Sequence, residues 1–255
     1  MIDGPPPATK MELRSLTGSP FAADGSLKRY SESSPGTQTS QFLNVTYSNH
    51  VWMDYLLYLP ASYDADQKKE WPLILFLHGS GERGYDLAKI KTHGLPPYLD
   101  TQKDFPFIVV SPQCPEHQYY DNDQLIVLLN EIQRKYRVDS SRVYLTGLSM
   151  GGWGAWQLAC AHPERFAAVA PVSGWGLEDL AENMKDLPVW AFHGADDKAV
   201  PLDWDQRMIN EVKKAGGDPK FTIYPGMGHN IWKKTYENPE LYEWFLAHQN
   251  TKHNP

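Results

Sequence analysis

Cysteine is scarce in this chain, which carries only Cys114 and Cys160 among its 255 residues. Two cysteines cannot make a disulfide framework, and neither lies in a CxxC or Cys/His spacing that would supply a structural zinc site. The histidines form no HExxH motif either. We therefore expect no metal and no cofactor. For the two cysteines, a single bridge and two free thiols both remain open.

Long apolar runs are also missing. No window approaches the roughly 18 to 20 consecutive apolar residues that a membrane-spanning helix needs, so no membrane partner is expected. The first residues lack the charged segment and apolar core of a signal peptide. The chain as given is expected to be soluble and cytoplasmic, or secreted if a signal peptide was removed from its start. The sequence gives no indication of oligomeric state.

Positive charge is limited as well. The chain has 24 Lys and Arg against 31 Asp and Glu, a formal charge of -7 at pH 7. Its basic residues cluster no further than pairs such as Lys68-Lys69 and Lys233-Lys234. Because binding to a polyanion needs a basic patch, we expect no nucleic-acid partner.

What the chain does contain is enough apolar material for a large core. Hydrophobic residues make up 41% and aromatic residues 13% of the sequence, which suits one domain of the larger α/β type. Residues 1–40 differ, because they hold the linker-like stretches 4–7 and 31–36 and few large apolar side chains. We interpret residues 1–40 as an N-terminal arm or linker and residues 41–255 as the catalytic domain.

Short apolar runs bounded by turn residues predict the strands of this domain. A β-rich stretch at 51–59 is followed by six nearly continuous apolar runs, which are typical of strands covered on both faces. Helical spacing of apolar residues occurs at 124–136 and 204–214. This alternation predicts an α/β fold with a mostly parallel sheet between helical layers. The six runs lie at 73–77, 107–110, 143–145, 166–170, 189–192 and 221–224.

The sequence Gly-Leu-Ser-Met-Gly-Gly at 147–152 places Ser149 between a predicted strand and a helix-like segment. A sharp turn from strand to helix holds its central residue in a strained conformation, and small neighbours let that turn close. The Ser149 hydroxyl is then presented at the end of the sheet, as a nucleophile requires.

Three more polar loops follow predicted strands, at 78–84, 193–197 and 226–230. Since parallel sheets bind ligands at the carboxyl ends of their strands, these loops and Ser149 are expected to meet at one edge. They supply, in chain order after Ser149, an aspartate at 196 or 197 and then His229. This is the order of nucleophile, acid and base in α/β-hydrolases.

Over residues 42–249 the chain resembles a small serine esterase of the α/β-hydrolase superfamily. It is similar to the group of dienelactone-hydrolase-like and prolyl-oligopeptidase-like enzymes that includes feruloyl and acetyl-xylan esterases and peptidases. The resemblance implies an α/β-hydrolase fold, and the short segment 173–186 predicts no large lid domain. The motifs that carry the resemblance lie at 78–84, 111–115, 147–152, 193–201 and 225–230.

The resemblance also implies roles for single residues. Ser149 corresponds to the nucleophile and His229 to the base. The family pattern HGxxDxxVP selects Asp197 as the acid over the adjacent Asp196, because Val200 lies three positions later. Dienelactone hydrolase itself uses cysteine where this chain has Ser149, so dienelactone chemistry is not implied.

The oxyanion of the reaction is expected to bind backbone N–H groups of Met150 and of Ser80 or Gly81. Two other histidines, His78 and His193, are interpreted as structural residues that bond loop backbone. Glu82 and Arg83 are expected to form a local ion pair that holds the first loop.

Residues in or beside these loops are candidates for substrate contact, although core packing is the alternative for Trp153. The expected function is hydrolysis of short-chain or aromatic esters, with a small-molecule ester as partner. A serine peptidase and a non-catalytic binding protein on the same fold are the alternatives. The candidates for substrate contact are Gly81, Gln113, Tyr120, Trp153, Trp175 and Trp232.

Overall fold

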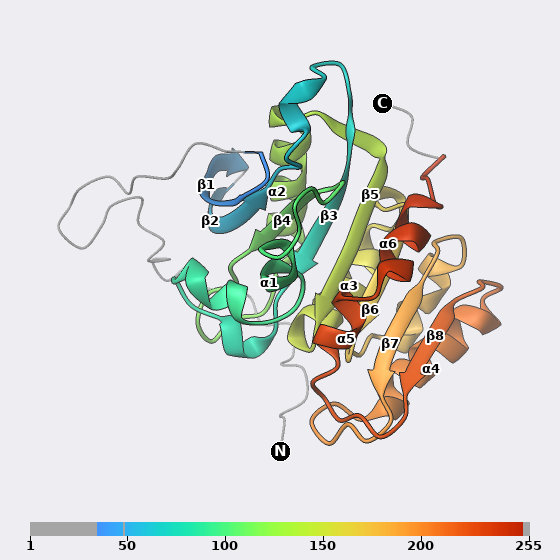
Figure 1. Ribbon diagram of the computed structural model, residues 1–255. Coiled ribbons are helices and arrows are strands. Elements are labelled where there is room, and N and C mark those ends of the chain that lie inside the picture. Colours follow the sequence, from blue (N-terminus) through green and yellow to red (C-terminus); the bar gives the residue numbers. More distant parts are fainter. Residues whose placement is uncertain (1–34, 48, 252–255) are drawn as a thin grey trace.

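The computed structural model describes residues 35–47 and 49–251, which build one twisted sheet with helices packed against it (Figure 1). The sheet has eight strands in the order β1-β2-β4-β3-β5-β6-β7-β8. β2 pairs antiparallel with β1 and β4, and the remaining neighbours are parallel. The strands are β1 (Gln38–Tyr47), β2 (Asn49–Tyr58), β3 (Trp71–Leu77), β4 (Ile108–Pro112), β5 (Val138–Leu148), β6 (Ala168–Val172), β7 (Trp190–Gly194) and β8 (Lys220–Tyr224).

The helices form a layer on each side of this sheet. α2, α3 and α4 pack into one hydrophobic cluster, and α1, α5 and α6 pack into the other. The α-helices are α1 (Leu95–Leu99), α2 (Asn122–Lys135), α3 (Met150–Ala161), α4 (Leu202–Lys214), α5 (Trp232–Tyr236) and α6 (Pro239–Leu246). The 3-10 helices are η1 (Tyr63–Ala65), η2 (Ser80–Glu82), η3 (Leu87–Thr92), η4 (Pro163–Arg165) and η5 (Glu178–Met184).

The central strand β3 shows why the apolar runs are continuous. Leu73, Leu75 and Leu77 point into the cluster beneath α2, α3 and α4, whereas Ile74 and Phe76 point into the opposite cluster. Successive side chains of a strand face opposite sides, so a strand covered on both faces must be apolar at every position. The predicted α/β fold with a mostly parallel sheet is thus confirmed.

The antiparallel edge of the sheet was not predicted. β1 pairs with β2 along its whole length, from Gln38 opposite Tyr58 to Tyr47 opposite Asn49. Its first four residues, Gln-Thr-Ser-Gln, form no apolar run, because an edge strand is held mainly by backbone pairing. β1 begins inside the segment interpreted as an arm. Residues 1–34 lie outside the described part, so that interpretation stays a prediction.

Other elements differ in length from the predicted ones. β5 runs from Val138 to Leu148, well beyond the expected 143–145. Its residues 139–142 are polar and half-buried, so they show no apolar run. The short helices α1, α5 and α6 were not predicted, because five to eight residues are too few to show helical periodicity. Between β6 and β7 the described chain forms only η5, in line with the expected lack of a large lid domain. Across residues 35–47 and 49–251, no helix has the length and apolar character to cross a membrane.

Candidate active site

Ser149 lies at the sharp turn between β5 and α3. Its backbone has φ 55° and ψ -117°, a left-handed conformation that a residue with a Cβ adopts only under strain. The Ser149 N–H donates to the Val172 carbonyl of the neighbouring strand at 2.9 Å. A Cβ on Gly147 would lie 2.8 Å from the Leu77 carbonyl oxygen, so the turn requires a glycine there. The local sequence therefore fixes the half-buried position of the serine at the end of the sheet.

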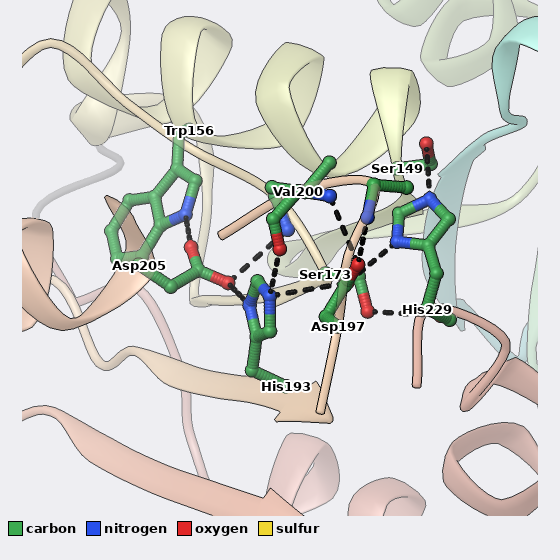
Figure 2. Close-up of polar contacts among 10 residues, drawn as sticks. Ser149, Trp156, Ser173, His193, Asp197, Val200, Asp205 and His229 are labelled. Carbon is green, nitrogen blue, oxygen red and sulfur yellow. Dashed lines mark hydrogen bonds and ion pairs between the residues drawn. The ribbon is translucent and has the colours of Figure 1, made fainter. Parts of the chain in front are cut away.

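His229 lies between Ser149 and Asp197, as Figure 2 shows. Its Nε2 is 2.9 Å from Ser149 Oγ, and its Nδ1 is 2.6 Å from Asp197 Oδ2. An ionised carboxylate can only accept, so Nδ1 carries the proton and Nε2 is free to accept the serine proton. The three residues come from the ends of β5, β7 and β8. They have the geometry of a Ser-His-Asp catalytic triad.

Asp197 is held in its ionised form by the donors around it. Its Oδ1 accepts the backbone N–H groups of Ala199 at 2.8 Å and Val200 at 2.9 Å. Burial alone would raise the pKa of Asp197, but hydrogen bonds from His193, His229 and Val200 outweigh burial and hold that pKa well below its ordinary value. The adjacent Asp196 has an exposed side chain. The structure thus places Asp197 against His229.

The backbone N–H groups expected to bind the oxyanion lie at the starts of two helices. Met150 is the first residue of α3, and Ser80 and Gly81 open η2, so their N–H groups are among those that lack an intrahelical acceptor. An added Cβ on Gly81 would find no atom within 4 Å. A role of these N–H groups in binding a developing oxyanion stays a prediction.

His78 fixes the loop that follows β3. Its Nε2 accepts the Cys114 N–H at 2.9 Å, and its Nδ1 lies 2.6 Å from the Gly79 carbonyl oxygen. Burial lowers the pKa of His78 to about 4, with smaller opposing effects from Gly79 and Glu82. The ring is therefore neutral, with the proton on Nδ1, and it connects two stretches of backbone.

Glu82 and Arg83 do not form the predicted local ion pair. Glu82 Oε1 instead lies 2.8 Å from His93 Nδ1. Arg83 Nε donates to Met150 Sδ at 2.9 Å, and its guanidinium lies over the Tyr119 ring at 4.8 Å. The pair fails because adjacent residues of a helical turn point in different directions, one into the core and one toward the surface.

Four of the candidates for substrate contact form two pairs. Gln113 and Tyr120 are buried and hold the first loop: Gln113 Nε2 donates to the Glu82 carbonyl, and the Tyr120 hydroxyl accepts the His78 N–H. Trp153 and Trp175 are only half-buried, with ring centroids 6.2 Å apart. Trp153 lies in the first turns of α3, after Ser149, and Trp175 lies three residues after the end of β6.

Trp232 packs against the ring of His229. Its ring centroid is 4.9 Å from that of His229, at nearly a right angle, and 6.3 Å from that of His93. The indole is buried, and its Nε1 has no hydrogen-bond partner among the described residues. Trp232 therefore packs edge-on against the His229 imidazole and helps to hold it in place.

Sequence reasoning missed Asp205 and Ser173. Asp205 is buried on α4, where its carboxylate contacts His193 at 2.7 Å and accepts the Trp156 indole N–H at 2.6 Å. Ser173 has φ 47°, and its Oγ donates to the His229 carbonyl at 3.3 Å. One signal for Asp205 was in the sequence. It shares the helical spacing of the buried apolar residues Met208, Ile209 and Val212, where an acid is out of place.

The two cysteines are free thiols. Cys114 and Cys160 are both buried and unbridged, which decides between the two alternatives left open by the sequence. Burial raises the pKa of each thiol to about 12, so both remain protonated at neutral pH. Within the described residues, no three His, Cys, Asp or Glu side chains gather as a metal site.

Several known proteins resemble this chain in sequence. Probable feruloyl esterase C of Aspergillus terreus is 25% identical over 171 residues, covering 64% of this chain and 62% of that protein. Carboxylesterase SOBER1 of Arabidopsis thaliana is 32% identical over 98 residues, covering 36% and 43%. This chain thus spans less than two thirds of the length of both relatives.

Solved structures show the same fold. A thermostable esterase superposes with a TM-score of 0.73 at 29% identity, covering 83% of this chain and 63% of that one. The acylaminoacyl peptidase of Pyrococcus horikoshii gives a TM-score of 0.63 at 15% identity, covering 86% and 43%, a likeness of fold alone. The model of the dienelactone hydrolase family matches residues 117–245, just over half of the chain and including all of Ser149, Asp197 and His229. The chain therefore belongs to the dienelactone hydrolase family of α/β-hydrolases.

Proposed function

We propose that this protein is a serine carboxylesterase that hydrolyses small esters through an acyl-enzyme on Ser149. The observation that carries the proposal is the continuous line of hydrogen bonds from Ser149 through His229 to Asp197, with the serine on a strained turn. A serine hydroxyl is a weak nucleophile unless a base takes its proton, and His229 Nε2 is within reach to do so.

The first half of the reaction forms the acyl-enzyme. Ser149 Oγ attacks the ester carbonyl carbon while His229 Nε2 accepts the hydroxyl proton, and Asp197 stabilises the imidazolium that results. The carbonyl oxygen becomes negative and binds the N–H groups of Met150 and of Ser80 or Gly81. Collapse of this intermediate breaks the bond to the alcohol, which leaves with the proton from His229. Water, activated by His229, then attacks the acyl-enzyme carbonyl in the same way. The bond to Ser149 Oγ breaks and the acid is released.

Short-chain or aromatic esters fit this site best. The half-buried indoles of Trp153 and Trp175 offer an aromatic surface near the nucleophile, and the described chain has only η5 where a lid would be inserted. Relatives named feruloyl esterase and carboxylesterase support an ester substrate. A peptidase fits less well, because the peptidase neighbours share 15% identity and are more than twice as long as the region they share with this chain.

Turnover of p-nitrophenyl acetate by the full chain and by Ser149→Ala tests the proposal. Loss of the nucleophile should lower kcat by about 10⁴-fold or more while the circular dichroism spectrum and Tm stay unchanged. Ser141→Ala is the matched control, because Ser141 lies in the other half of β5 and its hydroxyl donates only to Asp139. Equal turnover in Ser149→Ala and the parent would overturn the assignment.

Substrate class is tested by matched leaving groups and acyl groups. The parent protein should cleave p-nitrophenyl esters much faster than p-nitroanilides of the same acyl group, and it should accept acetyl, butyryl and feruloyl esters better than octanoyl esters. Faster cleavage of anilides and peptides would favour the peptidase alternative. No turnover of any substrate, together with no labelling of Ser149 by an organophosphonate, would favour a binding protein.

A further inference from the structure

His193 lies fully buried behind the triad, between the carboxylates of Asp197 and Asp205 (Figure 2). Its Nδ1 is 2.7 Å from Asp205 Oδ2, and its Nε2 is 3.3 Å from Asp197 Oδ2. All three side chains have 0% exposure to solvent. Because α4 packs against β7, His193 and Asp205 extend the chain of contacts from Asp197 into the protein core.

The hydrogen bonds around His193 fix its protonation. Asp205 accepts N–H groups from Trp156 at 2.6 Å and from Gly174 at 3.1 Å, so its oxygens act as acceptors and Nδ1 must carry a proton. Nε2 lies 3.0 Å from the Val200 carbonyl oxygen, which can only accept, so Nε2 must carry one too. An imidazole protonated on both nitrogens is a cation.

The electrostatic environment also favours two protons on the His193 ring. Burial alone would lower the pKa of His193, but hydrogen bonds to Asp197 and Asp205 outweigh burial and raise that pKa to about 10. His78 provides an internal comparison, since it also follows a strand and precedes a glycine. His78 accepts a backbone N–H and has no carboxylate at either ring nitrogen, and its ring is neutral. The carboxylates of Asp197 and Asp205 therefore explain why His193 is charged and His78 is not.

His193 also closes the loop that carries the triad acid. Val200 donates its N–H to Asp197 Oδ1 and offers its carbonyl to His193, so one ring binds the carboxylate and the segment that orients it. Asp197 Oδ2 is shared between His193 at 3.3 Å and His229 at 2.6 Å. The negative charge of one carboxylate is thus divided between two imidazoles.

We propose that His193, held as a cation by Asp205, is a positioning residue for Asp197 that orients the carboxylate and draws off part of its negative charge. This inference rests on the proposed esterase function. With less negative charge directed at His229, its imidazolium form is stabilised less, so we expect activity to persist in mildly acidic solution. His193, which does not touch substrate, would thus determine how far into acid pH the enzyme stays active.

Few charged groups face this arrangement within the described residues. β7 contributes His193, α4 contributes Asp205, and the loop after β8 contributes His229. From α3 and from the segment after β6 come neutral donors, the Trp156 indole and the Gly174 N–H. On α4, Asp203 and Arg207 pair with each other at 3.1 Å. Trp232, which packs against His229, also contacts His93, the partner of Glu82.

The test removes the charge of Asp205 without changing its size. In Asp205→Asn the ring of His193 should become neutral, and the acid limb of the kcat/KM profile should move to higher pH by about one unit, since a neighbouring charge shifts titration by about that much or more. At the parent's half-maximal pH this is about a fivefold loss of kcat/KM relative to the parent. KM should stay nearly constant, because Asp197 acts on the base and not on substrate binding.

Tyr144→Phe is the matched control. It also removes one buried hydrogen bond, from the Tyr144 hydroxyl to the His248 carbonyl at 3.0 Å, but on a strand position remote from the acid. Its pH profile should superimpose on that of the parent. The proposal is overturned if Asp205→Asn, shown to be folded by its Tm, keeps the parent profile or loses the same fraction of activity at every pH.

A second readout is independent of turnover. Nitrogen NMR of histidine-labelled protein at pH 7 should show the ring of His193 protonated at both nitrogens in the parent and at one nitrogen in Asp205→Asn. The resonance is assigned by its loss in His193→Gln. A neutral His193 in the parent overturns the inference even if the protein is an esterase. An inactive parent with a doubly protonated His193 would instead refute the proposed function and leave the charged pair in place.

Discussion

Gly151 lies in direct contact with the carbonyl of Leu77, so closely that a Cβ at this position would overlap that oxygen. The first turn of α3 therefore packs its backbone against the end of β3, with no side chain between them. Because Leu77 leads into the loop with Ser80 and Gly81, this contact fixes how closely Ser149 approaches that loop, which is the proposed oxyanion site.

Gly151→Ala should push α3 away from β3. The added methyl group would also lie 2.7 Å from the His78 carbonyl oxygen, closer than van der Waals contact permits, so backbone must move. We expect the free energy of unfolding to fall by about 1–3 kcal/mol and kcat to fall with KM little changed. Urea unfolding and esterase kinetics measure both effects.

Gly81→Ala is the control for stability, because its Cβ would meet no atom within 4 Å. Its free energy of unfolding should match that of the parent within about 0.5 kcal/mol. If Gly151→Ala proves as stable and as active as the parent, the close backbone contact does not shape the site.

The two adjacent aspartates should respond very differently to substitution. Asp197→Asn removes the acceptor that fixes the tautomer of His229 and should lower kcat by about 10⁴-fold. Asp196→Asn changes an exposed side chain and should stay within about threefold of the parent, since surface substitutions rarely matter. Kinetics at pH 8 with one ester decide the point. A larger loss at Asp196 would reassign the acid.

Stability should depend on pH through the buried pair of Asp197 and His193. The pKa of Asp197 is depressed in the folded protein from its ordinary 3.8, so its contribution is present above about pH 4 and is lost as pH falls further. The pKa of His193 is raised from 6.5 to about 10, so its contribution is complete below pH 6.5 and is lost as pH rises through about 10.

Between pH 7 and pH 10 the parent should therefore lose stability with a slope of up to about 1.4 kcal/mol per pH unit from this one proton. Urea unfolding of the parent and of His193→Gln at several pH values measures the slope. The variant should be less stable at pH 6 and flatter toward pH 10. Parallel curves for the two proteins would show that His193 carries no extra proton in the folded state.

The local features of the site could be predicted from sequence because they depend on neighbours in the chain. Gly147 and Gly151 on either side of Ser149 are a requirement of the turn itself. The apolar runs of β3 and β5 show burial on both faces. β1 escaped prediction, since an edge strand is stabilised by pairing with β2 rather than by a pattern of its own.

Contacts between distant residues are where prediction failed. Glu82 pairs with His93 and not with Arg83, because the direction of a side chain depends on the turn that carries it. His193 was expected to bond loop backbone, and it does so at Val200. Its contact with Asp205 requires that α4 pack against β7, and no short-range pattern describes that packing.

The sequence by itself determined the family, the order of the polar loops along the chain and the glycines that the turn at Ser149 demands, since each is a property of a few consecutive residues. Only the tertiary structure decided how Asp197 is held against His229, whether the cysteines are bridged, and that His193 lies buried between two carboxylates. Charge in a protein core depends on which groups packing brings within hydrogen-bond distance, and residues such as Asp205 and His193 meet only when the chain has folded.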